Sequence, residues 1–155
     1  MGEKLGRRVQ RRTMDLSYIE GVGTFIYCTS TKRYLFLLRN GDKYDGTWGL
    51  AGGKIDPGEH LLSSLSRELT EELGYNFRSI KVIPLEKFTS DNGNFVYNTF
   101  FIPLDGEFIP LLNEEHRGYC WVALEDHPKP LHPGVWRTIN FDVIKEKIKT
   151  LQEVL

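Results

Sequence analysis

Three glutamates, Glu68, Glu71 and Glu72, stand close together near the middle of the chain. In an α-helix, which turns 100° per residue, they fall within one sector of roughly 100°. Like charges at this spacing repel each other, and near a helix C-terminus the helix dipole adds to the penalty. A divalent cation reverses that penalty, because Mg²⁺ and Mn²⁺ select oxygen ligands. The pattern therefore indicates either a metal site or, in the simpler interpretation, a solvated helix face.

A helix over residues 59–73 is predicted to position these carboxylates. Leu62, Leu65, Leu69 and Leu73 recur at steps of three and four residues, which is one helical face. Gly74 follows directly, where a left-handed helix stop is most easily made. Arg67 lies in the same turn as the glutamates, and we expect it to hold one carboxylate through a charge-assisted hydrogen bond.

Runs rich in Tyr, Phe, Val and Ile on both sides of this helix predict strands. They cover residues 21–28, 34–38, 80–88, 95–104 and 119–124, with a short strand at 48–50. A polar gap at 30–33 predicts a hairpin, and the Asp-Asn-Gly-Asn sequence at 91–94 predicts a turn. From Trp136 on, an amphipathic helix is expected, with Ile144, Ile148, Leu151 and Leu155 on one face. This order indicates an α/β fold, a sheet between helices.

The size and charge of the chain limit its class. Its 155 residues, 40% hydrophobic and 26% charged, predict a single globular domain over 1–155. A formal net charge of −1 gives no overall field that recruits nucleic acid or a membrane. No apolar run approaches the ~20 residues of a membrane-spanning helix, and the N-terminus lacks the apolar segment of a secretory signal. We therefore expect a cytoplasmic protein without a membrane partner, and we expect Cys28 and Cys120 to be buried, reduced thiols.

Residues 1–15 are predicted to form a basic N-terminal tail. Its arginines form two pairs, Arg7–Arg8 and Arg11–Arg12. The simpler interpretation is a solvated, partly ordered tail. The alternative is a local contact with phosphate or RNA, in which case neutralising the arginines weakens substrate binding at low salt.

The whole segment 53–75, GKIDPGEHLLSSLSRELTEELGY, carries more information than its glutamates alone. It resembles the box of the Nudix hydrolase (MutT-like) family, a fixed spacing of glycine, glutamate, Arg-Glu, Glu-Glu and glycine. Those positions are here Gly53, Glu59, Arg67, Glu68, Leu69, Glu71, Glu72, Gly74 and Tyr75. At average composition, a chance match is on the order of one in ten million, which outweighs the solvated-face interpretation. Two departures are Tyr75, where an aliphatic residue is usual, and Ala51, where the family often has proline.

The resemblance implies an α/β/α sandwich with a mixed sheet, in which the box forms a loop, a helix and a loop. It also implies a metal-dependent pyrophosphohydrolase, with Mg²⁺ or Mn²⁺ as cofactor, that cleaves the diphosphate linkage of a small nucleotide substrate. ADP-ribose, nucleotide sugars, dinucleoside polyphosphates and nucleoside triphosphates are the candidate substrates. The implied metal ligands are the carboxylates of Glu68, Glu71 and Glu72 and the backbone carbonyl of Gly53. Glu59, paired with Arg67, and Gly74 would support the box.

The general base stays open, because family members use either a box glutamate or a glutamate on a distant loop. Residues 113–116, Asn-Glu-Glu-His, form a polar stretch before the last strand. We prefer Glu115 as the base, with Glu114 as the second loop candidate and Glu71 as the box candidate. Two surface glutamates before a strand are the simpler interpretation of this stretch.

Substrate selection must come from outside the box. Arg39 ends the second strand, where it can meet a phosphate. Aromatic faces accept any base by stacking, although a core role is commoner for each such residue. The stacking candidates are Tyr18, Trp48, Phe25, Phe88 and Tyr97.

Two other functions and one assembly remain as alternatives. An RNA 5′-pyrophosphohydrolase is favoured only by the N-terminal arginines. A non-catalytic nucleotide-binding Nudix module is disfavoured, because every carboxylate of the box is present. A homodimer is the alternative use of the apolar face of the C-terminal helix.

Overall fold

The structure is a computed structural model, and it describes residues 18–41, 43–77 and 80–155. The strands are β1 (Ile19–Cys28), β2 (Arg33–Arg39), β3 (Trp48–Gly49), β4 (Ala51–Lys54), β5 (Ile83–Thr89), β6 (Phe95–Leu104) and β7 (His116–Val122). The helices are α2 (Leu61–Leu73), α3 (Pro133–Ile139) and α4 (Asp142–Val154), with a 3₁₀ turn η1 (Leu124–Asp126).

The strands form one mixed sheet in the order β3-β2-β1-β6-β5, with β4 paired to β1 and β7 to β2. β1 and β6 run parallel, and the other pairs are antiparallel. β1 changes partner along its length: Tyr27 and Cys28 pair with β2, whereas residues 21–24 pair with β4. This change of partner brings Gly52 and Gly53 of β4 beneath α2, which packs on β4.

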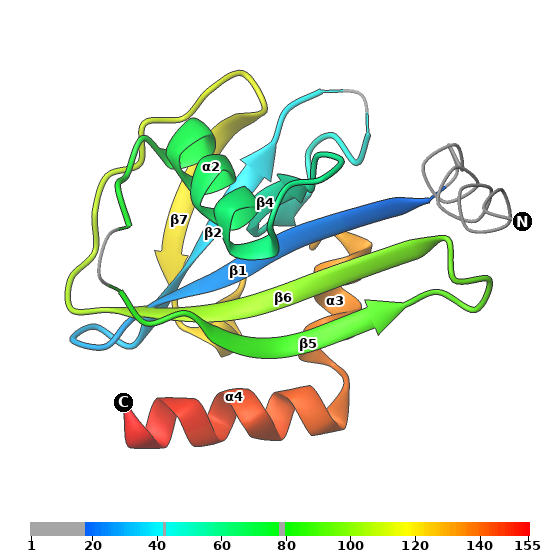
Figure 1. The fold of residues 1–155 in the computed structure, drawn as a ribbon. Coiled ribbons are helices and arrows are strands. Elements are labelled where there is room, and N and C mark those ends of the chain that lie inside the picture. The colour runs from blue at the N-terminus through cyan, green and yellow to red at the C-terminus, as the bar shows by residue number, and fades with distance from the viewer. Residues whose placement is uncertain (1–17, 42, 78–79) are drawn as a thin grey trace, which may run out of the picture.

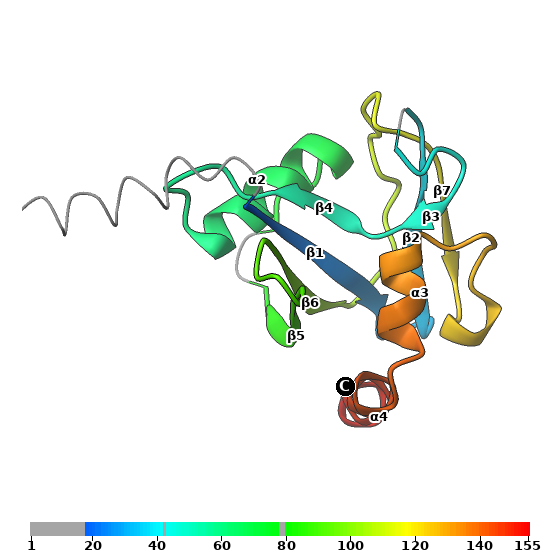
Figure 2. The same cartoon turned by 90° about the vertical axis from the view of Figure 1, so that its right-hand side faces the viewer.

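Helices cover both faces of the sheet (Figures 1 and 2). Side chains of β1 alternate between the faces, as a strand requires. Val22 and Ile26 lie in the core under α2, whereas Phe25 and Tyr27 lie in the core under α3 and α4. The predicted α/β sandwich is confirmed.

The buried face of α2 differs from the predicted leucine face. Leu65, Leu69 and Leu73 are at most 2% exposed, but Leu62 is 48% exposed. The buried side also includes Ser64, Glu68 and Glu72, so its centre is rotated toward the glutamates and Leu62 lies at its margin. The prediction that Leu62 joins the core was wrong.

α2 begins two residues after the predicted start. His60 caps it, because its Nδ1 accepts a hydrogen bond from the Leu62 N–H at 3.3 Å. At the other end, Gly74 has the expected left-handed conformation, with φ 64°, and donates its N–H to the Thr70 carbonyl.

Both predicted hairpins are confirmed, but three other boundaries differ. β1–β2 and β5–β6 are antiparallel neighbours. β5 begins at Ile83, and β7 begins at His116, three residues earlier than expected. The C-terminal segment forms two helices instead of the single helix predicted. α3 begins at Pro133, earlier than expected, with His132 as its N-cap, and the extended backbone of Phe141 (φ −83°, ψ 115°) separates it from α4.

The C-terminal helix uses its apolar face within the chain. Ile144 and Ile148 are buried in the core under α3 and α4, and Leu151 packs against that core, whereas Leu155 is 38% exposed.

The two cysteines are free thiols, and Cys28 is buried whereas Cys120 is half-buried. No helix in the described part of the chain is long and apolar enough to cross a membrane. The basic tail at 1–15 lies outside the described residues.

Candidate active site

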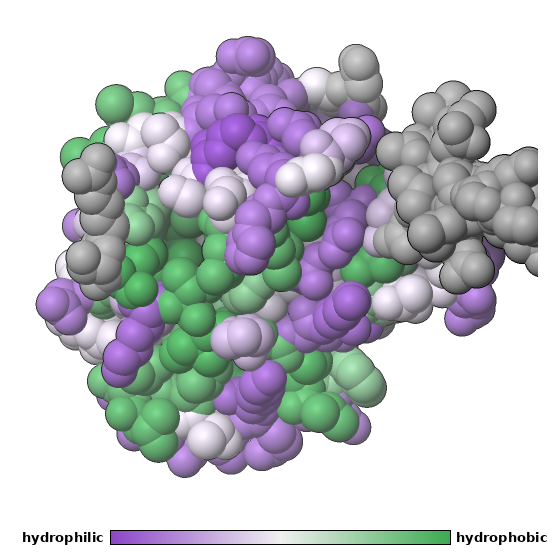
Figure 3. Space-filling view, in the orientation of Figure 1, coloured by the Kyte–Doolittle hydropathy of each residue, from purple (hydrophilic) through white to green (hydrophobic). Residues whose placement is uncertain are grey.

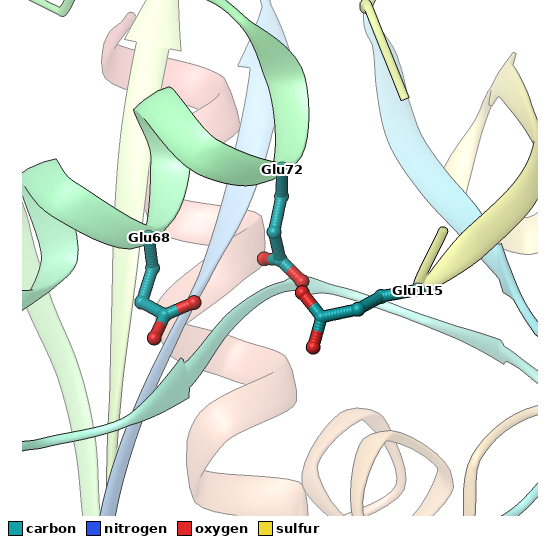
Figure 4. Close-up of side chains that lie close together, drawn as sticks. All are labelled: Glu68, Glu72 and Glu115. Atoms are coloured by element: carbon teal, nitrogen blue, oxygen red, sulfur yellow. The ribbon is translucent and has the colours of Figure 1, made fainter. Parts of the chain in front are cut away.

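Three carboxylates meet where the C-terminal half of α2 faces the loop before β7 (Figure 4). Glu68 and Glu72 come from α2, Glu115 comes from the loop, and the three side chains point toward one another. Each offers one oxygen, and these oxygens lie within 4.8 Å of one another. Glu68 and Glu72 are buried, whereas Glu115 is exposed. We refer to Glu68, Glu72 and Glu115 as the carboxylate cluster.

Burial and mutual repulsion both oppose negative charge in this cluster. Burial raises the pKa of Glu72 well above its usual value, and the charges of Glu115 and Glu68 add to this effect. The Gly52 N–H, which donates to Oε1 of Glu72 at 2.6 Å, acts in the opposite direction. Burial also raises the pKa of Glu68. Three converging carboxylates of this kind fit a hard divalent cation, whose charge would relieve the repulsion.

Arg67 ties the helix to the loop that precedes it. Its Nε and Nη2 donate to the two oxygens of Glu59 at 2.8 and 3.0 Å, and Nη2 also donates to the Lys54 carbonyl. Its Nη1 donates to Oε1 of Glu68 at 3.0 Å. The bidentate contact holds the pKa of Glu59 at about 2. The expected pair of Glu59 and Arg67 is therefore present, and the same guanidinium orients one carboxylate of the cluster.

Glu71 lies outside the cluster. Its side chain is 51% exposed and accepts from Nη1 of Arg67 at 3.2 Å. The outward side of α2 is polar, and hydrophobic residues gather below it over the neighbouring strands (Figure 3). The structure therefore brings Glu115, rather than Glu71, together with Glu68 and Glu72, and a ligand role for Glu71 stays a prediction.

Two glycines of β4 allow α2 to approach the sheet. A Cβ atom on Gly53 would lie 2.5 Å from the carboxyl group of Glu68. A Cβ atom on Gly52, whose φ is 155°, would lie 2.0 Å from the Val22 carbonyl oxygen. The glycines at these positions are thus required by the close packing of β1, β4 and the Glu68 side chain.

Asparagines fix the loop that carries Glu115. Asn113 accepts the Glu115 N–H at 3.0 Å, and its Nδ2 donates to Oε2 of Glu115 and to the Glu71 carbonyl at the end of α2. Asn40, after β2, donates its backbone N–H to the Glu115 carbonyl and its side-chain N–H to the Glu114 carbonyl. Neither asparagine was predicted from the sequence, although an asparagine two positions before a glutamate is typical of a side-chain-stabilised turn.

His116 is a third residue of the site that was not predicted from the sequence. Its side chain is 2% exposed, and its Nδ1 lies 3.6 Å from Oε2 of Glu72. Burial, together with the positive charge of Arg39, lowers the pKa of His116 to about 4.

The substrate-binding candidates are spread around the sheet. The positive charge of Arg39 acts to lower the pKa of both Glu72 and His116, and its Nε–H donates to the Lys43 carbonyl at 3.2 Å. Trp48 of β3 pairs with Leu38 of β2, and its side chain packs against the core under α3 and α4. Tyr18 lies at the start of β1 and donates to Glu20 at 3.0 Å.

The other aromatic candidates divide between core and surface. Phe25 is fully buried, and Phe88 lies under the guanidinium of Arg137 at 4.4 Å. The ring of Tyr97 occupies the space that side chains at 21 and 23 would fill, because both are glycines. Glu72 and Glu68 raise the pKa of Tyr97 further after burial, and Arg39 lowers it, so the phenol lies within electrostatic range of the cluster.

A comparison with known families decides the interpretation of the box. The NUDIX domain matches residues 18–140, which include the segment 53–75, both loop asparagines and Glu115. The chain belongs to the NUDIX family. Members of this family are hydrolases that generally cleave diphosphate linkages, and the described fold agrees with that membership.

Individual NUDIX relatives are distant. The nucleoside triphosphatase NudI of Escherichia coli O17:K52:H18 is 26% identical over 129 residues, which are 76% of this chain and 86% of the relative. The crystal structure of a MutT NUDIX hydrolase from Burkholderia pseudomallei is 28% identical, with a TM-score of 0.64 over 75% of this chain and 91% of that one. A C. elegans Ap4A hydrolase is 18% identical, with a TM-score of 0.66 over 87% of this chain and 99% of that one. The last similarity shows the fold alone.

Proposed function

We propose that this protein is a divalent-cation-dependent pyrophosphohydrolase that cleaves a diphosphate linkage in a small nucleotide, with nucleoside triphosphates as the first class to test. The observation that carries the proposal is the meeting of Glu68, Glu72 and Glu115 within 4.8 Å. Two of these carboxylates are buried and disfavour their own ionisation, which is a costly arrangement unless a cation compensates for it.

The carboxylate cluster would hold the divalent cation. Glu68 and Glu72 supply the buried oxygens, and the Gly53 carbonyl and Glu71 remain the further ligands implied by the family. A bound Mg²⁺ or Mn²⁺ would neutralise diphosphate charge and lower the pKa of a bound water. Arg67 and the Gly52 N–H hold the carboxylates of Glu68 and Glu72 in place.

Glu115 is the proposed general base. It is the exposed member of the cluster, so water and substrate can reach it. Its carboxylate accepts a proton from the attacking water as oxygen bonds to phosphorus. The bridging phosphorus–oxygen bond then breaks, and the leaving phosphate takes the electron pair. Asn113 keeps Glu115 at the end of α2 during this step.

Arg39 and Tyr97 are proposed to bind the rest of the substrate. The positive charge of Arg39 favours the ionised form of Glu72, and the same guanidinium is proposed to bind a phosphate of the nucleotide. Tyr97 covers the two β1 glycines and offers an aromatic face to a base or ribose. The relative NudI is a nucleoside triphosphatase, which supports nucleoside triphosphates ahead of the other candidate nucleotides.

A hydrolysis screen tests this function. It covers the eight common nucleoside and deoxynucleoside triphosphates, ADP-ribose, nucleotide sugars, dinucleoside polyphosphates and 5′-triphosphorylated RNA, with Mg²⁺ or Mn²⁺. We expect cleavage of at least one triphosphate by the wild type and its loss in Glu72→Gln, while the exposed control Glu125→Gln retains it. Binding of nucleotides without any metal-dependent product would contradict the proposal and favour the non-catalytic module.

The RNA 5′-end activity stays a prediction from the sequence. It depends on Arg7, Arg8, Arg11 and Arg12, which lie outside the described residues. The triphosphorylated RNA arm of the screen tests it, together with the salt dependence of RNA binding, which falls steeply when several phosphates are contacted.

A further inference from the structure

His116 lies directly behind the carboxylate cluster, at the start of β7. Its Nδ1 is 3.6 Å from Oε2 of Glu72, and both side chains are at most 3% exposed. Among the described residues this nitrogen has no hydrogen-bond partner. Buried polar atoms are nearly always paired, so an unpaired nitrogen beside a buried carboxylate requires a functional or structural reason.

The position of His116 is that of a donor and not of a ligand. In the described part of the chain, the group of side chains that can share one ion is Glu68, Glu72 and Glu115, and His116 is not in it. His116 instead faces Oε2 of Glu72, whereas the Gly52 N–H donates to Oε1 at 2.6 Å. The Gly52 N–H and the His116 ring therefore lie next to different oxygens of the Glu72 carboxylate.

We propose that His116 is a positioning residue, which donates Nδ1–H to Oε2 of Glu72 and orients that carboxylate toward the divalent cation. An imidazole donates from Nδ1 when that nitrogen holds a proton, and the neighbours of the ring determine which nitrogen holds it. A carboxylate beside Nδ1 selects the Nδ1–H tautomer, because lone pairs would otherwise face each other. The distance between Nδ1 and Oε2 exceeds that of a usual hydrogen bond by about 0.7 Å, so the proposed bond requires a small movement of the His116 or Glu72 side chain.

The positioning role of His116 rests on the proposed function in one respect, which is that Glu72 is a metal ligand. With the Gly52 N–H on Oε1 and the proposed His116 donor on Oε2, the plane of the carboxylate would be held before a cation arrives. Partners that orient a ligand in this way commonly contribute 10–100-fold to metal affinity or activity. The described environment of Glu68 differs, because Arg67 supplies its partner.

Metal affinity of three histidine variants tests the role, measured by calorimetry with Mn²⁺ and without nucleotide. His116→Phe keeps a planar ring but removes the donor, and we expect it to weaken Mn²⁺ binding roughly 10–100-fold. His116→Asn retains an N–H near the position of Nδ1 and should restore most of the affinity. His127→Phe, a half-buried histidine whose Nδ1 lies 3.1 Å from the Pro128 carbonyl oxygen, is the matched control and should bind as the wild type does.

The wild type itself provides a second readout that does not depend on the folding of a variant. Nitrogen NMR of the His116 ring should show the Nδ1–H tautomer, with a shift of that signal on addition of Mg²⁺. An Nε2–H tautomer, or unchanged Mn²⁺ affinity in His116→Phe while Glu72→Gln loses it, would overturn the role of His116 and leave the proposed function intact. Absence of Mn²⁺ binding by the wild type would overturn both.

Discussion

Glu72 combines burial with negative neighbours, two conditions that a carboxylate normally avoids. It is 2% exposed, and the charges of Glu115 and Glu68 act on it. The Gly52 N–H, which donates to its Oε1, and the positive charge of Arg39 act in the opposite direction. Because an uncompensated buried charge is costly, this residue is where a bound cation would have its largest effect on the protein.

Glu115 is predicted to be essential for the chemical step. Glu115→Gln removes the proton acceptor without changing the size of the side chain, so kcat should fall by about 10²-fold or more. Steady-state kinetics on the substrate found in the screen measures this, with the adjacent Glu114→Gln as the control. A near-normal kcat in Glu115→Gln would return the role of general base to the box, to Glu71.

Glu59 is predicted to stabilise the folded protein in a pH-dependent way. Its pKa, about 2 in the folded protein, lies below the usual value near 4.3, so its contribution is present above about pH 4.3 and is lost as the pH falls toward 2. Glu59→Gln should therefore lower the melting temperature at pH 7, and the difference from the wild type should shrink between about pH 4 and pH 2.

Thermal melts at several pH values check the Glu59 prediction. Glu125→Gln, at an exposed position, serves as the control for loss of a surface charge. An equal difference between Glu59→Gln and the wild type at all pH values would mean that the bidentate contact with Arg67 does not control the stability of the box.

At the scale of elements, the site depends on the packing of α2 against β4. Gly53→Ala places a Cβ atom 2.5 Å from the carboxyl group of Glu68 and should displace that carboxylate. A displacement of about 1 Å can lower turnover by about 10²-fold. Gly118→Ala on β7 is the matched control, because its Cβ atom would make an ordinary contact of 3.6 Å with Leu38.

Gly53→Ala is expected to affect catalysis at the site and not the stability of the sheet. We expect similar melting temperatures for the two alanine variants and a large loss of kcat/KM only in Gly53→Ala. Full activity in Gly53→Ala would show that the position of Glu68 in this structure is not the one used in turnover.

The sequence predicted the elements whose signals are local. The box helix, its glycine stop and both hairpins follow from spacing and turn residues within a few positions of one another. The burial of Glu68 and Glu72 did not follow, because charged residues are normally assigned to the solvent face. The break at Phe141 was missed because the apolar spacing continues across it, while local capping ends α3.

The remaining parts of the site depend on contacts between distant segments. Glu115 approaches α2 because β7 pairs with β2 as far as His116 and Arg39, where the register shifts. Asn40 and Asn113 then hold the loop that carries Glu115. Nothing in residues 113–116 alone distinguishes Glu115 from Glu114. The unpaired nitrogen of His116 is likewise visible only after folding, since it results from burial.

At the scale of the whole molecule, α3 and α4 support the sheet from the side opposite α2 (Figure 2). The apolar face of α4 packs on this chain's own core, with Ile144 and Ile148 at most 5% exposed. That face therefore gives no support to the predicted homodimer, which sedimentation would test. The sheet thus has a packed core on each face.

A divalent-ion titration of nucleotide hydrolysis tests the central claim most directly, with the wild type compared to Glu68→Gln and Glu72→Gln. We predict no turnover in the presence of a chelator, saturable activation of the wild type by Mg²⁺ or Mn²⁺, and at least about 10²-fold lower turnover in each variant. Hydrolysis that resists the chelator, or variants that match the wild type at every ion concentration, would contradict the assignment of a metal-dependent active site to this cluster.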